Sequence, residues 1–92
     1  MMDRSFKTPV ELGHIIAKNL RAHRKARRVS MKRLSEMSGV SYGSVKRFER
    51  TGEVSLISLL KIAVVLDCAD ALEQLFLDVK PLSIQEIIDG NL

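Results

Sequence analysis

The side chains with the clearest chemical potential in this sequence are cationic, and they are concentrated in its first half. Residues 1–50 carry 13 Lys and Arg against four acids, a formal net charge of +9, whereas residues 51–92 carry two against seven, a formal net charge of −5. Ammonium and guanidinium groups bind phosphate oxygens well. This distribution indicates one face for a polyanion and another face for a different partner, although a solvated charged surface has the same distribution.

Residue types that support catalysis or metal binding are sparse. His14 and His23 lie nine positions apart on one expected helix, which places them on different faces. Cys68 is the single cysteine, so we interpret it as a small packed hydrophobe. The sequence contains no Ser-His-Asp order, no paired-carboxylate motif and no glycine-rich phosphate loop. We therefore predict no enzyme activity, no metal site and no cofactor.

Length and composition indicate one small domain. Ninety-two residues, 46% of them hydrophobic, suffice for a single core. Only 4% of residues are aromatic and Trp is absent, which disfavours a stacking platform for single-stranded nucleic acid. The first residues lack the apolar core of a signal peptide, no run of 18 apolar residues occurs, and a single cysteine suits a reducing compartment. We expect a cytoplasmic protein without membrane association.

The elements that must position the cations are predicted to be helices, and the first begins after Thr8. Thr8 can cap this helix, Pro9 suits its first position, and Glu11 can complete a capping box. We expect the helix to reach Ala26. Its predicted buried stripe consists of Leu12, Ile15, Ile16 and Leu20.

A short helix is predicted next, over residues 31–38. Ser30 is its cap, and Leu34 and Met37 are expected to face inward. Gly39 ends it, because glycine adopts the left-handed conformation without steric cost.

Another short helix, over residues 42–50, follows this turn directly. Ser41 caps it, and Val45 and Phe48 are expected to face the interior. The opposite face is basic and polar, with Tyr42, Gly43, Lys46, Arg47 and Arg50. Two short helices joined by a glycine turn, the second with a basic face, are the components of a helix-turn-helix, whose second helix enters the DNA major groove.

The second half of the sequence adds three helices. Ser55 caps a fourth helix through Leu66, and a capping box at residues 83–86 starts a sixth, which Gly90 ends. Between them a brief fifth helix is expected to contain Ala71, Leu72, Leu75 and Phe76. No strand alternation and no repeat is present, so the predicted fold class is all-α. We expect a domain at residues 8–77, an N-terminal tail at 1–7 and a C-terminal tail at 78–92.

A set of spaced residues gives the helix pattern a family resemblance. They are Leu20-Arg21, Arg24, Val29-Ser30, Leu34, Gly39-Val40-Ser41, Val45, Phe48-Glu49, Gly52, Leu59 to Ala63, and Leu66. Over roughly residues 14–76 the sequence resembles the phage-repressor-like helix-turn-helix family of lambda repressor and Cro, also called XRE. The resemblance implies a five-helix lambda-repressor-like domain followed here by a short tail helix. It also implies a structural ion pair between Arg24 and Glu49.

The resemblance also implies how the two short helices would meet DNA. The base-facing positions are Tyr42, Gly43, Lys46 and Arg47. Among them Arg47 is the expected guanine reader, although solvation is its alternative, and Lys46 is expected to bind phosphate from the flank. Seven other positions are expected to contact phosphates: Ser30, Met31, Lys32, Arg33, Ser41, Ser44 and Arg50.

Three positions depart from the family in ways that matter for the site, and at one of them Gly43 replaces a side chain that is often used on bases. Arg33 stands where a capping-box Glu or Gln is common, so the box is lost and a cation is gained near a helix N-terminus that already favours anions. Ser35 replaces the usual packed alanine, a change small enough to keep the two helices close.

We predict a regulator that binds a palindromic operator in double-stranded DNA as a homodimer. Two roles stay open: a plain repressor, or an antitoxin of HipB type that also binds a kinase-like toxin. The expected dimer or partner surface comprises Ile57, Val64, Ile84, Ile87 and Ile88, and the tail helix could instead fold back on its own domain. The alternative from another class is a protein-interaction module that keeps the fold without using DNA.

Overall fold

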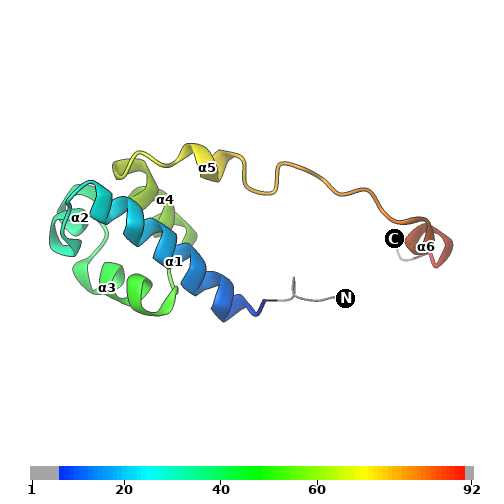
Figure 1. The fold of residues 1–92 in the computed structure, drawn as a ribbon, viewed down its shortest axis with the longest axis horizontal. Helices are drawn as coiled ribbons and strands as arrows, with labels where there is room; N and C mark the ends of the chain where they lie inside the picture. Colours follow the sequence, from blue (N-terminus) through cyan, green and yellow to red (C-terminus); the bar gives the residue numbers. More distant parts are fainter. Residues whose placement is uncertain (1–6, 91–92) are drawn as a thin grey trace.

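The computed structural model describes residues 7–90, and within this range the chain forms helices and no strand (Figure 1). The helices are α1 (Pro9–Ala26), α2 (Met31–Ser38), α3 (Tyr42–Thr51), α4 (Leu56–Val65), α5 (Asp70–Glu73) and α6 (Ile84–Ile88). The predicted all-α class is confirmed. Apart from Lys7, the predicted N-terminal tail lies outside the described residues, as do residues 91 and 92 of the C-terminal tail.

Side-chain caps set the starts of five helices. The Thr8 hydroxyl accepts a hydrogen bond from the Glu11 N–H at 3.1 Å, and the Glu11 carboxylate accepts from the Thr8 N–H at 2.7 Å. These hydrogen bonds, the one from the Thr8 backbone first, lower the pKa of Glu11 below its usual value. Serine hydroxyls cap α2, α3, α4 and α6 in the same way. The helix starts therefore depend on local sequence.

The core lies between the first four helices. Its largest fully buried side chains are Phe48, Leu34, Ile62, Leu66 and Val45. They come from α2, α3 and the end of α4, and α1 adds Ala17. The core is thus built mainly by the two short helices and α4, packed beneath α1.

The predicted buried stripe of α1 is largely wrong. Leu12 and Ile16 are 48% and 45% exposed, Ile15 is also exposed, and only Leu20 packs partly against the core. The buried side of α1 carries the small residue Ala17 and the polar residue Arg24. Hydrophobicity alone misplaced this face because α1 packs on α3 through a close contact at Gly13 and an ion pair at Arg24, and neither uses a large apolar side chain.

The close approach occurs between Gly13 of α1 and Gly52 at the end of α3. Gly52 has a φ of +82°, and a Cβ added to it would lie 2.7 Å from the Gly13 carbonyl oxygen. A larger residue would therefore meet backbone, which cannot move aside without shifting a helix. This contact sets the distance of α3 from α1.

Two smaller predictions about inward-facing residues are also wrong. Met37 is exposed, because the side of α2 that meets the core carries Met31 and Leu34. The fifth helix ends at Glu73, so Leu75 and Phe76 lie outside it and are exposed. Ala69, at its start, has no side-chain group that can cap it.

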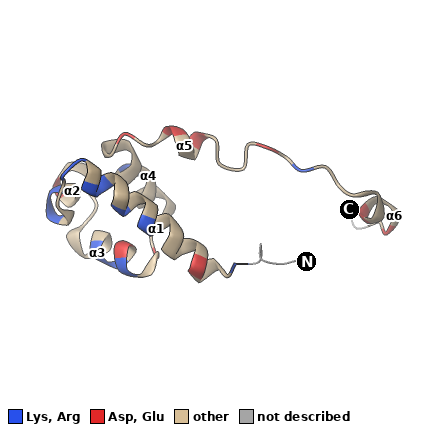
Figure 2. Cartoon of the chain, viewed as in Figure 1, with Lys and Arg blue, Asp and Glu red and all other residues tan. Residues whose placement is uncertain are grey.

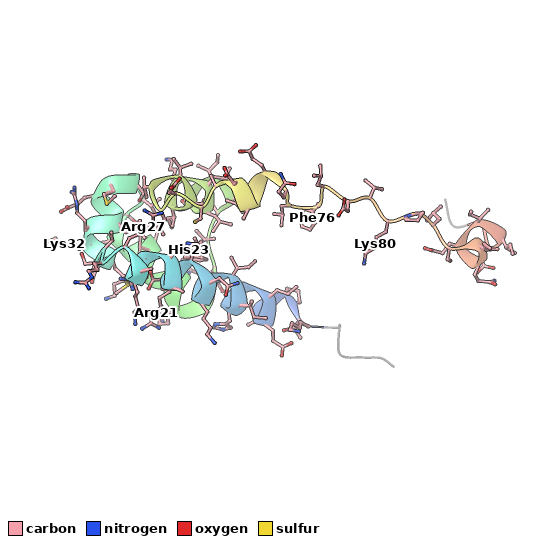
Figure 3. The ribbon with its side chains drawn as sticks, turned by 45° about the horizontal axis from the view of Figure 1, so that its top comes forward. Arg21, His23, Arg27, Lys32, Phe76 and Lys80 are labelled. Carbon is pink, nitrogen blue, oxygen red and sulfur yellow. The ribbon has the colours of Figure 1, made fainter. Side chains whose placement is uncertain are left out.

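Beyond α5 the chain leaves the body of the molecule. Residues 77–83 form an extended link that carries α6 away from the other helices (Figure 1), and the structure measures 54 × 23 × 21 Å. Phe76 and Lys80 project from this region without a helix beside them (Figure 3). Among the residues described, no helix is long and apolar enough to cross a membrane.

Candidate nucleic-acid interface

A buried ion pair fixes α3 against α1. Arg24 Nε donates to Glu49 Oε2 at 2.6 Å, and Arg24 Nη2 donates to Glu49 Oε1 at 2.9 Å. The third nitrogen, Nη1, donates to the Val29 carbonyl oxygen at 2.8 Å. Arg24 is only 8% exposed, so the pair is shielded from water. A bidentate pair in this setting fixes the orientation of two helices, even where its net contribution to stability is small.

Hydrogen bonds also define the turn between α2 and α3. Gly39 has a φ of +77° and ends α2. The Ser35 hydroxyl donates to the Val40 carbonyl oxygen at 2.6 Å, and the Ser38 hydroxyl accepts from the Val40 N–H at 3.1 Å. Sequence analysis treated Ser35 only as a small residue. Serine hydroxyls tend to form hydrogen bonds with nearby backbone groups, and this tendency was the sequence signal for the role of Ser35 in the turn.

The face of α3 opposite the core is exposed and cationic. Val45 and Phe48 are buried, whereas Lys46, Arg47 and Arg50 are exposed. Lys46 Nζ lies 5.3 Å from the centre of the Tyr42 ring, a cation–π distance. The predicted base-facing side chains therefore share one accessible surface.

Gly43 belongs to the same surface and has no neighbour. A Cβ added to it would meet nothing within 4 Å, and its φ lies outside the left-handed region. No contact with residues 7–90 requires glycine at this place.

Arg47 forms an exposed ion pair that sequence analysis did not foresee. Its Nε and Nη2 donate to Glu53 Oε1 at 3.1 and 2.5 Å, and the two side chains are 65% and 64% exposed. Glu53 follows Arg47 by six residues across the end of α3, a spacing that is not a helical pair. No sequence pattern therefore indicated the contact.

The predicted phosphate ligands gather at three places. Ser30, Met31, Lys32 and Arg33 lie at the start of α2, Ser41 and Ser44 at the start of α3, and Arg50 near its end. All three places lie in the cationic part of the molecule (Figure 2). Lys and Arg predominate on α1, α2 and α3, whereas acids predominate on α5 and α6.

These ligands differ in what they can offer. The hydroxyls of Ser30 and Ser41 already accept hydrogen bonds from the N–H groups of Arg33 and Ser44. Arg33 Nη1 lies 3.4 Å from a Glu36 carboxylate oxygen, in an exposed pair. Met31 is half-buried against the core, so only its backbone can serve a phosphate.

The predicted dimer or partner surface is not one surface within a single chain. Ile57 and Val64 are exposed on α4, and Ile84, Ile87 and Ile88 are exposed on α6, which stands apart from the body (Figure 1).

Cys68 packs partly against the core, and burial raises the pKa of its thiol above the usual value.

Two short helices joined by a tight turn, with an exposed cationic face on the second, define a helix-turn-helix DNA-binding domain. A family model described as a Cro/C1-type HTH DNA-binding domain matches residues 19–80, more than half of the chain. The chain belongs to this family, and it is a DNA-binding regulator of transcription. The match begins inside α1 and ends in the extended link, so α6 lies beyond it. No match to an individual curated protein was found.

Proposed function

We propose that the chain recognises a specific palindromic site in duplex DNA as a homodimer, and that α3 enters the major groove. The observation that carries this proposal is the accessible face with Tyr42, Lys46 and Arg47, held on the core by the buried Arg24–Glu49 pair. A rigid support keeps contact groups in register with base edges. Arg47 reads guanine, because a guanidinium can donate two hydrogen bonds to O6 and N7.

The flanking groups position the domain on the backbone. Lys32 and Arg33 at the start of α2 and Arg50 near the end of α3 bind phosphates on either side of the groove, and Lys46 joins them from the flank. First-turn N–H groups of α2 and α3 reinforce these contacts, because helix N-termini favour anions. These groups supply affinity, whereas Arg47 supplies sequence preference.

Dimerisation follows from the small size of the recognition element. One helix reads only a few base pairs, and two-fold symmetry combines two such contacts on half-sites about 34–36 Å apart. The exposed apolar residues of α4 and α6 supply the surface, and the separation of α6 from its own domain supports contact with a second copy. We assign this surface to a second copy rather than to a toxin, because a second copy adds the second half-site contact that one short recognition helix lacks. The regulator then acts as a repressor by occupying its operator.

Site selection from a randomised duplex pool, followed by titration over a salt series, tests the proposal. We expect a palindromic consensus, and a slope of log affinity against log salt of about −3.6 per protomer for four neutralised phosphates. Lys80→Ala, in the extended link, is the matched control for loss of a cation away from α3 and should leave the consensus unchanged. Absence of duplex binding at low salt would refute DNA recognition and favour the interaction module, for which exposed Ile57 and Val64 are the supporting observation.

A further inference from the structure

The exposed pair between Arg47 and Glu53 has a geometry that bears on base recognition. Both donors, Nε and Nη2, reach the same carboxylate oxygen, Oε1. A guanidinium has five N–H groups, and this contact occupies one edge of it. The end of the guanidinium, formed by the Nη1 hydrogens and the second Nη2 hydrogen, stays available. Because Glu53 occupies the other edge, this end is the part of the guanidinium that can donate two hydrogen bonds to guanine O6 and N7.

The backbone at the end of α3 places Glu53 for this contact. The Thr51 hydroxyl donates to the Arg47 carbonyl oxygen at 2.7 Å and accepts from the Glu53 N–H at 3.1 Å. Gly52, between them, has a φ of +82°, which reverses the chain direction. Glu53 is therefore tied to Arg47 through the backbone as well as through its carboxylate.

The charge of this unit favours a base over a phosphate. A lone arginine binds phosphates at any sequence, because that attraction needs no base contact. An arginine that carries a carboxylate forms a neutral unit, and a phosphate brought to it meets the negative charge of Glu53. A guanine edge has no net charge, so it accepts the free N–H groups without this repulsion.

We propose that Glu53 is a positioning residue that determines specificity: it orients the Arg47 guanidinium toward guanine and prevents it from acting as a general phosphate ligand. This inference rests on the proposed role of Arg47 as the base reader. A hollow lies beside the pair, lined by Ser44, Val54, Ser55 and Ser58 as well as by the pair itself.

The chain offers a matched control on α2. Glu36 also pairs with an exposed arginine, Arg33, but through one contact of 3.4 Å. Glu36→Gln and Glu53→Gln remove the same charge from exposed acids of similar accessibility. Only Glu53→Gln removes the negative charge beside the base reader, and it replaces the charge-assisted hydrogen bonds to Arg47 by weaker ones to a neutral amide oxygen.

The wild-type chain is first used to select a preferred duplex from a randomised pool. Affinity is then measured for three kinds of DNA: this selected duplex, its variants with one changed base pair, and random duplex. Glu53→Gln should lower the preference at the base pair that Arg47 reads by about three- to tenfold, because the neutral amide holds the guanidinium less firmly and more of its order must be gained on binding. It should also raise affinity for random duplex and steepen the salt slope by about 0.9. Glu36→Gln should raise affinity for every duplex alike.

Two further variants separate the possible outcomes. If Arg47→Ala leaves every base-pair preference unchanged, Arg47 is not the base reader, and the role of Glu53 fails with it. If Arg47→Ala removes one preference but Glu53→Gln behaves like Glu36→Gln, base reading stands and the positioning role is refuted. In the Arg47→Ala background Glu53→Gln should change no preference; a change there would mean that Glu53 contacts a base itself.

Discussion

Gly43→Ala should stabilise the fold and weaken DNA binding at the same time. Gly43 lies in the first turn of α3 with a φ outside the left-handed region, and an added Cβ meets no atom within 4 Å. Alanine in a helix is better than glycine by about 0.5–1 kcal/mol, chiefly because the unfolded chain has less freedom to lose. For a domain of this size that gain raises Tm by about 2–8 °C.

The effect on DNA has the opposite sign, because the new methyl group projects from the face proposed to meet the groove. Overfilling a packed contact costs about 1–3 kcal/mol, so affinity for the selected duplex should fall by about 5- to 150-fold. Thermal unfolding and duplex titration of the same preparation measure both changes.

Gly39→Ala is the matched control, since its Cβ also meets nothing within 4 Å but its φ is +77°. That variant should lose stability by about 1 kcal/mol. A lower Tm for Gly43→Ala would refute the helix-propensity argument. Unchanged affinity for the selected duplex would show that α3 does not approach DNA at this position.

Four other outcomes are expected. Gly52→Ala should destabilise the fold by about 2–5 kcal/mol in urea unfolding, because alanine is strained at a φ of +82° and its Cβ would meet the backbone of α1; a loss below about 1 kcal/mol contradicts the close approach. Glu49→Ala should cost about 3–5 kcal/mol in the same assay, since it leaves a buried arginine unpaired, and a neutral result would mean that water reaches that arginine. Lys46→Ala should lower the affinity for operator and for random duplex alike and reduce the salt slope by about 0.9. Arg47→Ala should instead lower the preference at one base pair by about 1–3 kcal/mol. If the two variants show the opposite results, Lys46 reads the base and Arg47 binds phosphate. A chain ending at Lys80 should sediment as a monomer at concentrations where the full chain is dimeric, and equal dimerisation would exclude α6 from the interface.

Helix starts and the central turn were predictable because the signals are local. Ser30 and Ser41 cap through their own backbone neighbours, and Gly39 ends α2 through its own φ. Such features need no knowledge of the rest of the chain. The helix-turn-helix arrangement and its family could therefore be predicted from the sequence.

Features that depend on the approach of distant segments were not predictable in the same way. Ile16 of α1 is exposed while Ala17 is buried, because a glycine from the end of α3 lies against this helix. A hydrophobicity pattern describes one helix and contains no information about what packs on it. Glu53 was missed for the same reason: its position next to Arg47 depends on the reversal at the end of α3.

The α3 helix has an inward face that holds the fold and an outward face that we propose meets DNA, and the two faces have no side chain in common. Val45, Phe48 and Glu49 face inward and hold the fold, whereas Lys46 and Arg47 point outward and contact nothing in the core. The consequence is evolutionary. The outward positions can be exchanged one at a time without loss of folding, so mutation can change the DNA sequence that such a regulator prefers while its scaffold stays intact. A duplicated copy of the gene could in this way acquire a new operator in a few steps, each passing through a folded protein.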